Sequence, residues 1–529
     1  MNRPCSVFRR VHRLPRFRAS LVPAALTLGC LLVSCQSSGE DTSAPTAIAP
    51  VAPEAEVRLF DETLELEDGA ALAYQRGVAT VAVRRDDPSS GTMEVEFFRF
   101  PRSADASADT PPIFLLHGGP GFRGLGPRLE RPGYFENRLA RLTRISDLIV
   151  PGQRGFGSST ATPCESGETL SMEEALDSEI RLGAIGDAAA DCRKKWESEG
   201  FDLTGLNVVE AAGDVVDIAR QLGYDQIQLR GGSFGSHWAM TILRFHPELV
   251  ARATLTGLEG PDHTYDMPGW VLGAMERIAA SAEASTVFGD RIPEGGLLNA
   301  YRELIARAAT KPIAVEIAHP ETGDPTVIEL DGDRLRRIFS RSTRYTGVRI
   351  RTAPWPLMLL DVLHGDYQEV TTSYVEDLRE IDLNDAAFYQ LDCGSGISRE
   401  RGVTLRSDPA AEMLGPTWLW YDVSCAPWDA DLGETFRGPF ESSVPTVLVQ
   451  GNWDTSTPYE NAVELRPFFR NHRFVHVEGG SHGALREALE EVEGFQEAMD
   501  HWLATGEMEQ IPESVELPPF PWTAELDES

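Results

Sequence analysis

The chain alternates short, continuously apolar runs with stretches in which apolar residues recur at helical spacing. The apolar runs have the length expected of strands that are buried on both faces of a sheet. Runs of this kind cover residues 111–116, 146–150, 227–230, 251–256, 444–450 and 473–477. Between them, helical spacing is clearest in Ala211, Val215, Ile218 and Leu222. Strands and helices in alternation predict an α/β fold with a doubly wound, mostly parallel sheet.

A long interruption separates the strand that ends near residue 257 from the strand that begins near residue 444. It contains helix-like segments at 270–285 and 295–309 and a hairpin-like turn at 320–324. We interpret this interruption as a large, mainly helical lid inserted into the sheet domain. The predicted organisation is a signal segment (1–35), a tether (36–55), the first part of the core (56–261), the lid (262–440), the second part of the core (441–505) and an acidic tail (506–529).

One predicted strand ends in the sequence GGSFG, which places Ser233 between Gly231 and Gly235. This pattern is typical of a nucleophile elbow, a tight turn from strand to helix whose close neighbours must be glycine. A second glycine-rich stretch, GGSHG around Ser481, also follows a predicted strand. The pattern alone therefore does not select the nucleophile.

The residues that follow later strands favour Ser233 over Ser481 as the nucleophile. A serine nucleophile needs a base and a group that orients the base. Asp454 and His482 each follow a predicted strand, and the order serine, acid, histidine is that of α/β-hydrolases. If Ser481 were the nucleophile, its only downstream histidine would be His501, which lies in an amphipathic helical pattern.

The sequence HGGPG after the strand at 111–116 supplies a candidate oxyanion loop, because glycines let the backbone approach a substrate closely. We assign the oxyanion donors as the backbone N–H groups of Phe234 and Gly119, with Gly118 as the alternative to Gly119. His117 is interpreted as structural. The overlapping GxGxxG pattern at 119–124 would suit a dinucleotide, but the following strand does not end in the acidic residue that holds a ribose.

The N-terminus has the anatomy of a secretory signal: a basic stretch, an apolar run and the sequence LVSC that ends at Cys35. LVSC resembles a bacterial lipobox, which predicts lipid attachment at Cys35, and an ordinary cleaved signal is the alternative. Residues 36–55 have the composition of a flexible tether. These features predict an extracytoplasmic protein that is anchored to a membrane without spanning it.

The charge of the chain narrows the classes of partner. The formal net charge is −34, and such a surface repels nucleic acid. We interpret the excess of acidic residues as a source of solubility.

Four cysteines lie outside the signal segment, at Cys164, Cys192, Cys393 and Cys425. In an oxidising compartment they predict two disulfides, for which three connectivities are possible. Pairing of sequence neighbours is the simplest of the three. A zinc site is the alternative, although the spacing of the cysteines does not favour it.

The motifs HGGPG, GQRGFGSS, GGSFGS, GNWDTSTP and GGSHG occur in this order. Together they resemble the proline iminopeptidase and tripeptidyl aminopeptidase family of α/β-hydrolases, from about residue 90 to residue 505. The resemblance implies Ser233 as nucleophile, Asp454 as orienting acid and His482 as general base. It also implies cleavage of peptides from a free N-terminus without a metal or another cofactor. Gly152 departs from the family, which usually has aspartate there, and the lid lacks the tryptophan and glutamate pattern of the proline-specific enzymes.

An aminopeptidase must bind a cationic α-amine, which requires a carboxylate near the nucleophile. Glu259, just after a strand end, is our first candidate and Asp262 is the second. The alternative for Glu259 is a brace at the junction with the lid. The leading hypothesis is a serine aminopeptidase that acts on peptides, and the alternatives are an esterase or amide hydrolase and a non-catalytic binding protein.

Overall fold

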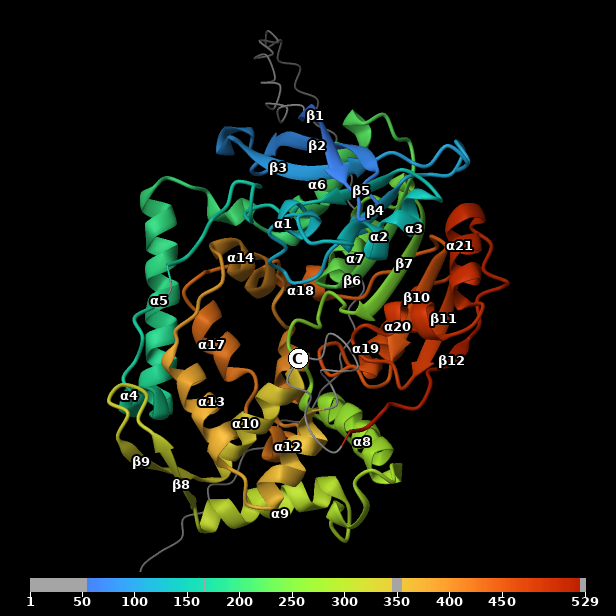
Figure 1. The fold of residues 1–529 in the computed structure, drawn as a ribbon. Helices are drawn as coiled ribbons and strands as arrows, with labels where there is room; N and C mark the ends of the chain where they lie inside the picture. Colours follow the sequence, from blue (N-terminus) through green and yellow to red (C-terminus); the bar gives the residue numbers. More distant parts are fainter. Residues whose placement is uncertain (1–54, 166, 345–353, 524–529) are drawn as a thin grey trace, which may run out of the picture. The chain divides into compact units, whose positions relative to one another are not determined.

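The computed structural model describes residues 55–165, 167–344 and 354–523 (Figure 1). The chain divides into two compact units, residues 1–50 and residues 51–529, and only the second falls within the described part. The predicted signal segment with Cys35, and the tether up to residue 54, lie outside the described residues.

The second unit is built on a ten-stranded sheet. The strands at one edge are antiparallel, and those from β5 to β12 are parallel, so the predicted mostly parallel sheet is confirmed. In order across the sheet, the strands are β1 (Glu56–Glu65), β2 (Ala71–Ala82), β3 (Thr92–Phe100), β5 (Leu148–Pro151), β4 (Ile113–Leu116), β6 (Ile227–Ser233), β7 (Val250–Leu258), β10 (Thr446–Gly451), β11 (His472–Glu478) and β12 (Ser514–Glu516).

Helices cover both faces of this sheet. Alternate residues of the central strands therefore pack into two different cores, one on each face. Leu448 of β10 packs in the core that contains Trp238 of α7, whereas Val447 and Val449 pack in the core that contains Trp502 of α21. The helices of this part are α1 (Gly126–Leu129), α2 (Tyr134–Arg138), α3 (Ala140–Thr143), α4 (Met172–Leu176), α5 (Ser178–Ser198), α6 (Val208–Gln221), α7 (Phe234–Phe245), α19 (Tyr459–Leu465), α20 (Ala484–Glu491) and α21 (Phe495–Thr505).

The register of the parallel strands brings their carboxyl ends to one edge of the sheet. Leu116 of β4 pairs with Gly231 of β6, and Ser233 pairs with Leu258 of β7. At the other side of β7, Gly451 of β10 pairs with Val477 of β11. The loops that follow these strands therefore start from the same edge, where α/β sheets bind their ligands.

The lid is mainly helical and has its own apolar core. The predicted hairpin is present as two antiparallel strands, β8 (Ile313–Ala318) and β9 (Pro325–Leu330). The lid helices are α8 (Pro268–Ala284), α9 (Leu297–Thr310), α10 (Gly332–Arg344), α12 (Pro354–Leu363), α13 (Gln368–Arg379), α14 (Ala386–Ser395), α15 (Arg399–Arg406), α16 (Ala411–Leu414), α17 (Leu419–Cys425) and α18 (Gly433–Arg437).

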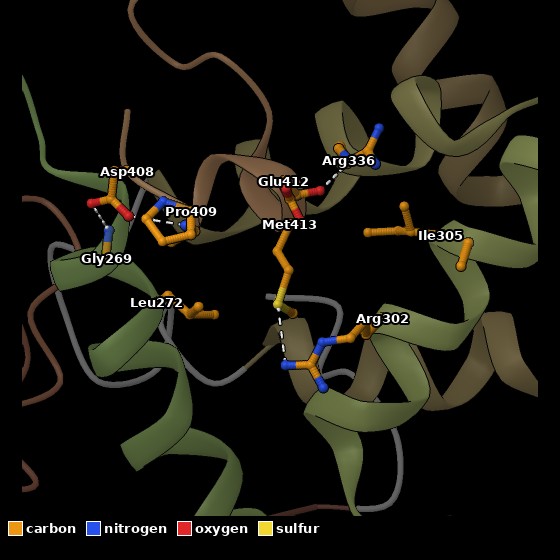
Figure 2. Close-up of a pocket in the computed structure, with 11 residues that line it drawn as sticks. Gly269, Leu272, Arg302, Ile305, Arg336, Asp408, Pro409, Glu412 and Met413 are labelled. Atoms are coloured by element: carbon orange, nitrogen blue, oxygen red, sulfur yellow. Dashed lines mark hydrogen bonds between the residues drawn. The ribbon is translucent and has the colours of Figure 1, made fainter. Parts of the chain in front are cut away.

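Helices α8, α9 and α10 and the segment 408–413 surround a pocket of about 510 Å³ (Figure 2). Two arginines stand at its wall: Arg302 donates to the sulfur of Met413, and Arg336 donates to the carbonyl oxygen of Glu412. The residues that line the pocket include no member of the predicted triad. The predicted triad residues instead follow strands that end at one edge of the sheet.

Two disulfides join sequence neighbours, Cys164 with Cys192 and Cys393 with Cys425. This is the simplest of the three pairings, and it leaves none of these four thiolates to hold zinc. The disulfides indicate folding in an oxidising, extracytoplasmic compartment. Within the described ranges, no helix is both long and apolar enough to cross a membrane.

Part of the segment predicted as an acidic tail (506–529) has regular structure and packs against the core. Residues 514–516 form β12, which pairs in parallel with β11 at the sheet edge. Beyond it, Leu517 is buried in the core that contains α21, and Trp522 is buried in the lid core. Before this segment, α20 and α21 are separate helices, and Gly494 adopts a left-handed conformation between them.

Trp522 joins the C-terminal segment to the lid. Its ring lies 5.5 Å from that of Phe288, and its indole N–H donates to the hydroxyl of Ser281. Trp522→Ala is expected to lower the free energy of unfolding by about 3 kcal/mol, because it leaves a large cavity. The urea midpoint of unfolding measures the effect. Val463→Ala, at an exposed helical site, is the control, and equal small shifts for both variants would contradict the packing.

Candidate active site

Ser233 occupies a strained turn at the junction of β6 and α7. Its φ and ψ angles are 58° and −133°, a conformation that side chains rarely adopt. The neighbouring backbone is too close for side chains: a Cβ atom on Gly231 would lie 2.2 Å from the carbonyl oxygen of Gly235, and one on Gly235 would lie 2.2 Å from that of Leu116. These contacts explain why the sequence has glycine on both sides of the serine.

Asp454 and His482 form a hydrogen-bonded pair at the ends of β10 and β11. Nδ1 of His482 lies 2.9 Å from Oδ2 and 3.1 Å from Oδ1 of the aspartate. The carboxylate is fully buried, and the imidazole is partly exposed. Since Nδ1 faces the carboxylate, the opposite ring nitrogen, Nε2, is left for a substrate or a nucleophile.

The end of β7 connects this pair to Ser233. Leu258 pairs in register with Ser233, and the preceding Gly257 lies against the histidine: a Cβ atom there would be 3.1 Å from Cε1 of His482. Ser233 and His482 therefore flank the same two residues. The structure pairs the histidine with the acid and places both the serine and the histidine at the end of β7.

Two polar residues that sequence reasoning missed hold the carboxylate of Asp454. Thr457 donates to it through its backbone N–H, at 2.8 Å, and through its hydroxyl, at 2.7 Å. The side-chain amide of Gln450 donates to Oδ2 at 3.1 Å and also accepts from the backbone N–H of Leu258 at 2.8 Å. The threonine could have been suspected, because Asp-Thr-Ser-Thr favours a turn in which the acid accepts from the following backbone.

The hydrogen bonds shift the two pKa values in opposite directions. Burial lowers the pKa of His482, but the charge of Asp454 and the hydrogen bond to it outweigh burial, so this pKa is raised. Burial raises the pKa of Asp454, but His482 and the donors of Thr457 outweigh it, so this pKa is lowered. The aspartate therefore stays ionised, and the histidine becomes neutral only at a pH above its ordinary value of about 6.5.

Ser481 has a structural position. It is fully buried, its hydroxyl donates to the carboxylate of Glu487, and its backbone N–H donates to the same carboxylate at 2.8 Å. The backbone N–H of Gly483 donates to the serine oxygen at 3.2 Å. Ser481 thus braces the loop that carries His482, and its hydroxyl is bound to Glu487.

The glycine loop after β4 lies against the serine. A Cβ atom on Gly118 would be 2.9 Å from Cβ and 3.5 Å from Oγ of Ser233, so this loop forms one wall of the site together with Gly119. Phe234 is buried at the first turn of α7. His117 stacks on Phe122, and burial lowers the pKa of His117 to about 3, which keeps it neutral.

Glu259 lies in an acidic environment that extends to the histidine. Burial, followed by the negative charges of Asp392 and Asp266, raises the pKa of Glu259 well above its ordinary value. Burial also raises the pKa of Asp392 to about 7, against a hydrogen bond from Tyr421. Asp266 contributes to the raised pKa of His482 as well. Sequence reasoning missed Asp266 and Asp392, because nothing in their spacing marks them.

The other candidate carboxylate, Asp262, has a bracing contact. Its Oδ1 accepts a hydrogen bond from the backbone N–H of Ser398, at the start of α15.

The position of Gly152, where the resembling family usually has aspartate, leaves no space for a side chain. A Cβ atom there would lie 2.7 Å from Oγ of Ser159 and 2.8 Å from the carbonyl oxygen of Glu96.

Comparison with known proteins identified two family models. The model described as "alpha/beta hydrolase fold" matches residues 111–287, which include Ser233. The model described as "TAP-like protein" matches residues 411–514, which include Asp454 and His482.

Two curated relatives are tripeptidyl aminopeptidases of Streptomyces lividans and of Streptomyces coelicolor. The first is 22% identical over 441 residues, which cover 77% of this chain and 78% of the relative. The second is also 22% identical over 441 residues, which cover 77% of each chain.

Two similar solved structures are a serine hydrolase from Cycloclasticus zankles and an esterase from Exiguobacterium antarcticum. The first has a TM-score of 0.33 and 13% identity, and the match covers 80% of this chain and 97% of that one. The second has a TM-score of 0.33 and 14% identity, with coverage of 84% and 100%.

The shift at His482 can be tested directly. Asp454→Asn removes the negative charge beside Nδ1, so the pKa of His482 is expected to fall from above about 6.5 to below it. The measurement is a pH titration of the imidazole by NMR of histidine-labelled protein. Asp262→Asn is the control, and it should leave this titration in place. An unchanged pKa in Asp454→Asn would contradict the pairing.

Proposed function

We propose that this chain, which belongs to the α/β-hydrolase family and to its tripeptidyl aminopeptidase branch, is a serine aminopeptidase that releases short peptides from free N-termini. The carrying observation is the acidic environment around Glu259 beside the pair of Asp454 and His482. The catalytic groups by themselves suit esters as well as amides. A site for a positive charge next to them is what favours an aminopeptidase.

The proposed reaction passes through an acyl-enzyme. Oγ of Ser233 attacks the scissile carbonyl carbon while Nε2 of His482 takes its proton, and the backbone N–H groups of Phe234 and Gly119 bind the resulting oxyanion. Collapse breaks the C–N bond, and His482 returns the proton to the leaving amine. Water then attacks the acyl carbon, again with His482 as base, and the peptide acid leaves.

The α-ammonium group of the substrate binds at Glu259 in this proposal. Burial, and then repulsion from neighbouring carboxylates, raises the pKa values of Glu259 and Asp392, and a bound cation would stabilise their charged forms. Asp392 lies on α14 and its hydrogen-bond partner Tyr421 lies on α17, so the lid supplies part of the amine site. Asp262 braces α15 instead.

We further propose that Cys35 carries a lipid, which would anchor the mature protein to a membrane. The basic and apolar segments before Cys35 and the tether after it support this assignment. The disulfides agree with an extracytoplasmic location.

The nucleophile is tested by covalent labelling. A fluorophosphonate is expected to modify Ser233 in the mature protein, and peptide mapping by mass spectrometry locates the adduct. Ser233→Ala should abolish labelling, whereas Ser481→Ala should retain an adduct at Ser233. If the wild-type protein forms no adduct at Ser233, the proposal that it is a serine hydrolase is wrong. If it hydrolyses short-chain esters but not tripeptidyl amides, the result favours an esterase.

The amine site is tested with Glu259→Gln. The KM for tripeptidyl amides with a free N-terminus should rise about 10-fold or more, because a charge-assisted contact contributes about 1.5–3 kcal/mol. The KM for N-acylated esters should stay within about twofold. Steady-state kinetics at one pH measures both, and equal losses on the two substrates would remove the amine-binding role.

A further inference from the structure

The side chain of Gln153 makes four hydrogen bonds to the oxyanion loop, which we define as residues 117–122. Its oxygen accepts from the backbone N–H groups of Gly121, at 2.8 Å, and Phe122, at 3.1 Å. Its nitrogen donates to the carbonyl oxygens of His117, at 2.9 Å, and Gly118, at 3.3 Å. These bonds use the full capacity of a primary amide, which has two donors and two acceptor sites.

The bonds to the two carbonyl groups determine which way the next N–H groups point. In a trans peptide, the C=O of one residue and the N–H of the next point in opposite directions. Because the carbonyl groups of His117 and Gly118 face Gln153, the N–H groups of Gly118 and Gly119 face away from it. Ser233 lies next to Gly118, where a Cβ atom would be 2.9 Å from Cβ of the serine. The N–H groups of both candidate oxyanion donors are therefore directed away from Gln153.

Gln153 also removes the competing donors. The N–H groups of Gly121 and Phe122 are bound to its side-chain oxygen, so they are not available to an oxyanion. Within the loop, the N–H groups of Gly118 and Gly119 are therefore the ones that Gln153 does not bind, and Gly118 lies next to Ser233.

The backbone around Gln153 is itself fixed. Gln153 comes two residues after the end of β5, and the residue is 1% exposed. The next residue, Arg154, is fully buried, forms an ion pair with Asp214 and donates to the carbonyl oxygens of Val83 and Gly205. The amide that holds the loop is therefore anchored to the core from behind.

We propose that Gln153 is a positioning residue that aims the oxyanion-hole N–H groups at the substrate carbonyl. The proposal rests on the proposed function, since an oxyanion forms only if Ser233 attacks a carbonyl. Loss of the amide would leave the triad in place and leave the donors misdirected. The defect should therefore appear in the transition state and in the polarisation of the acyl carbonyl, with substrate binding little changed.

The test compares Gln153→Met, which keeps the volume and loses all four bonds, with Gln153→Asn, which keeps an amide that is one methylene too short. Both variants and the wild type are acylated with p-nitrophenyl cinnamate labelled with ¹³C at the carbonyl. Infrared difference spectra then give the carbonyl stretching frequency of the acyl-enzyme. We expect the band to move to higher wavenumber, kcat to fall about 100-fold, as for loss of one oxyanion donor, and KM to stay within about threefold.

Ser159→Ala is the matched control. Ser159 is buried on the turn that follows Gln153, and its hydroxyl accepts a hydrogen bond from the backbone N–H of Glu96 on β3. Among the hydrogen bonds of the described residues, none joins Ser159 to the oxyanion loop. It should lower the unfolding midpoint without moving the carbonyl band. If the Gln153 variants show the wild-type band, or if Ser159→Ala moves it equally, the inference is overturned. If the wild type does not acylate at Ser233, the proposed function itself fails.

Discussion

The buried negative charge of Asp454 is the constraint on which the site depends. A carboxylate without contact to water is stable only if donors surround it. Here the donors come from Thr457 on its own turn, from Gln450 on β10 and from His482 after β11. Gln450 in turn holds the end of β7 through Leu258, which pairs with Ser233. Satisfying one charge therefore aligns the ends of β6, β7, β10 and β11.

The strands and the order of the candidate triad were predictable because they leave local signals. Buried parallel strands are continuously apolar, and close backbone contacts leave glycine at Gly231 and Gly235. The residues that support the site leave weaker signals. Gln450 is a polar residue at the end of an apolar strand, and Gln153 stands in a turn, so their roles follow only from what the fold brings against them.

The lid explains why the acidic cluster of Glu259, Asp266 and Asp392 was only partly predictable. Glu259 follows a strand end, and this position could be recognised from the sequence. Asp266 is separated from it by a turn, and Asp392 lies far along the chain on α14 of the lid. Both sit among many acidic residues in a chain of net charge −34. Composition does not distinguish a carboxylate that solubilises the surface from one that is buried beside another. The two kinds of carboxylate differ in whether they are buried beside another negative charge, and only the fold determines this.

The second disulfide connects this electrostatic arrangement to the compartment in which the protein folds. Cys393 is adjacent to Asp392 on α14, and Cys425 lies on α17 one turn after Tyr421, which donates to Asp392. The covalent link therefore joins the two helices whose side chains meet at the acidic cluster. The disulfide limits how far these two helices can separate, and it therefore keeps Tyr421 within reach of Asp392. It does so only where an oxidising environment keeps the bond intact, so the electrostatic arrangement around Asp392 depends on the compartment that the disulfides indicate.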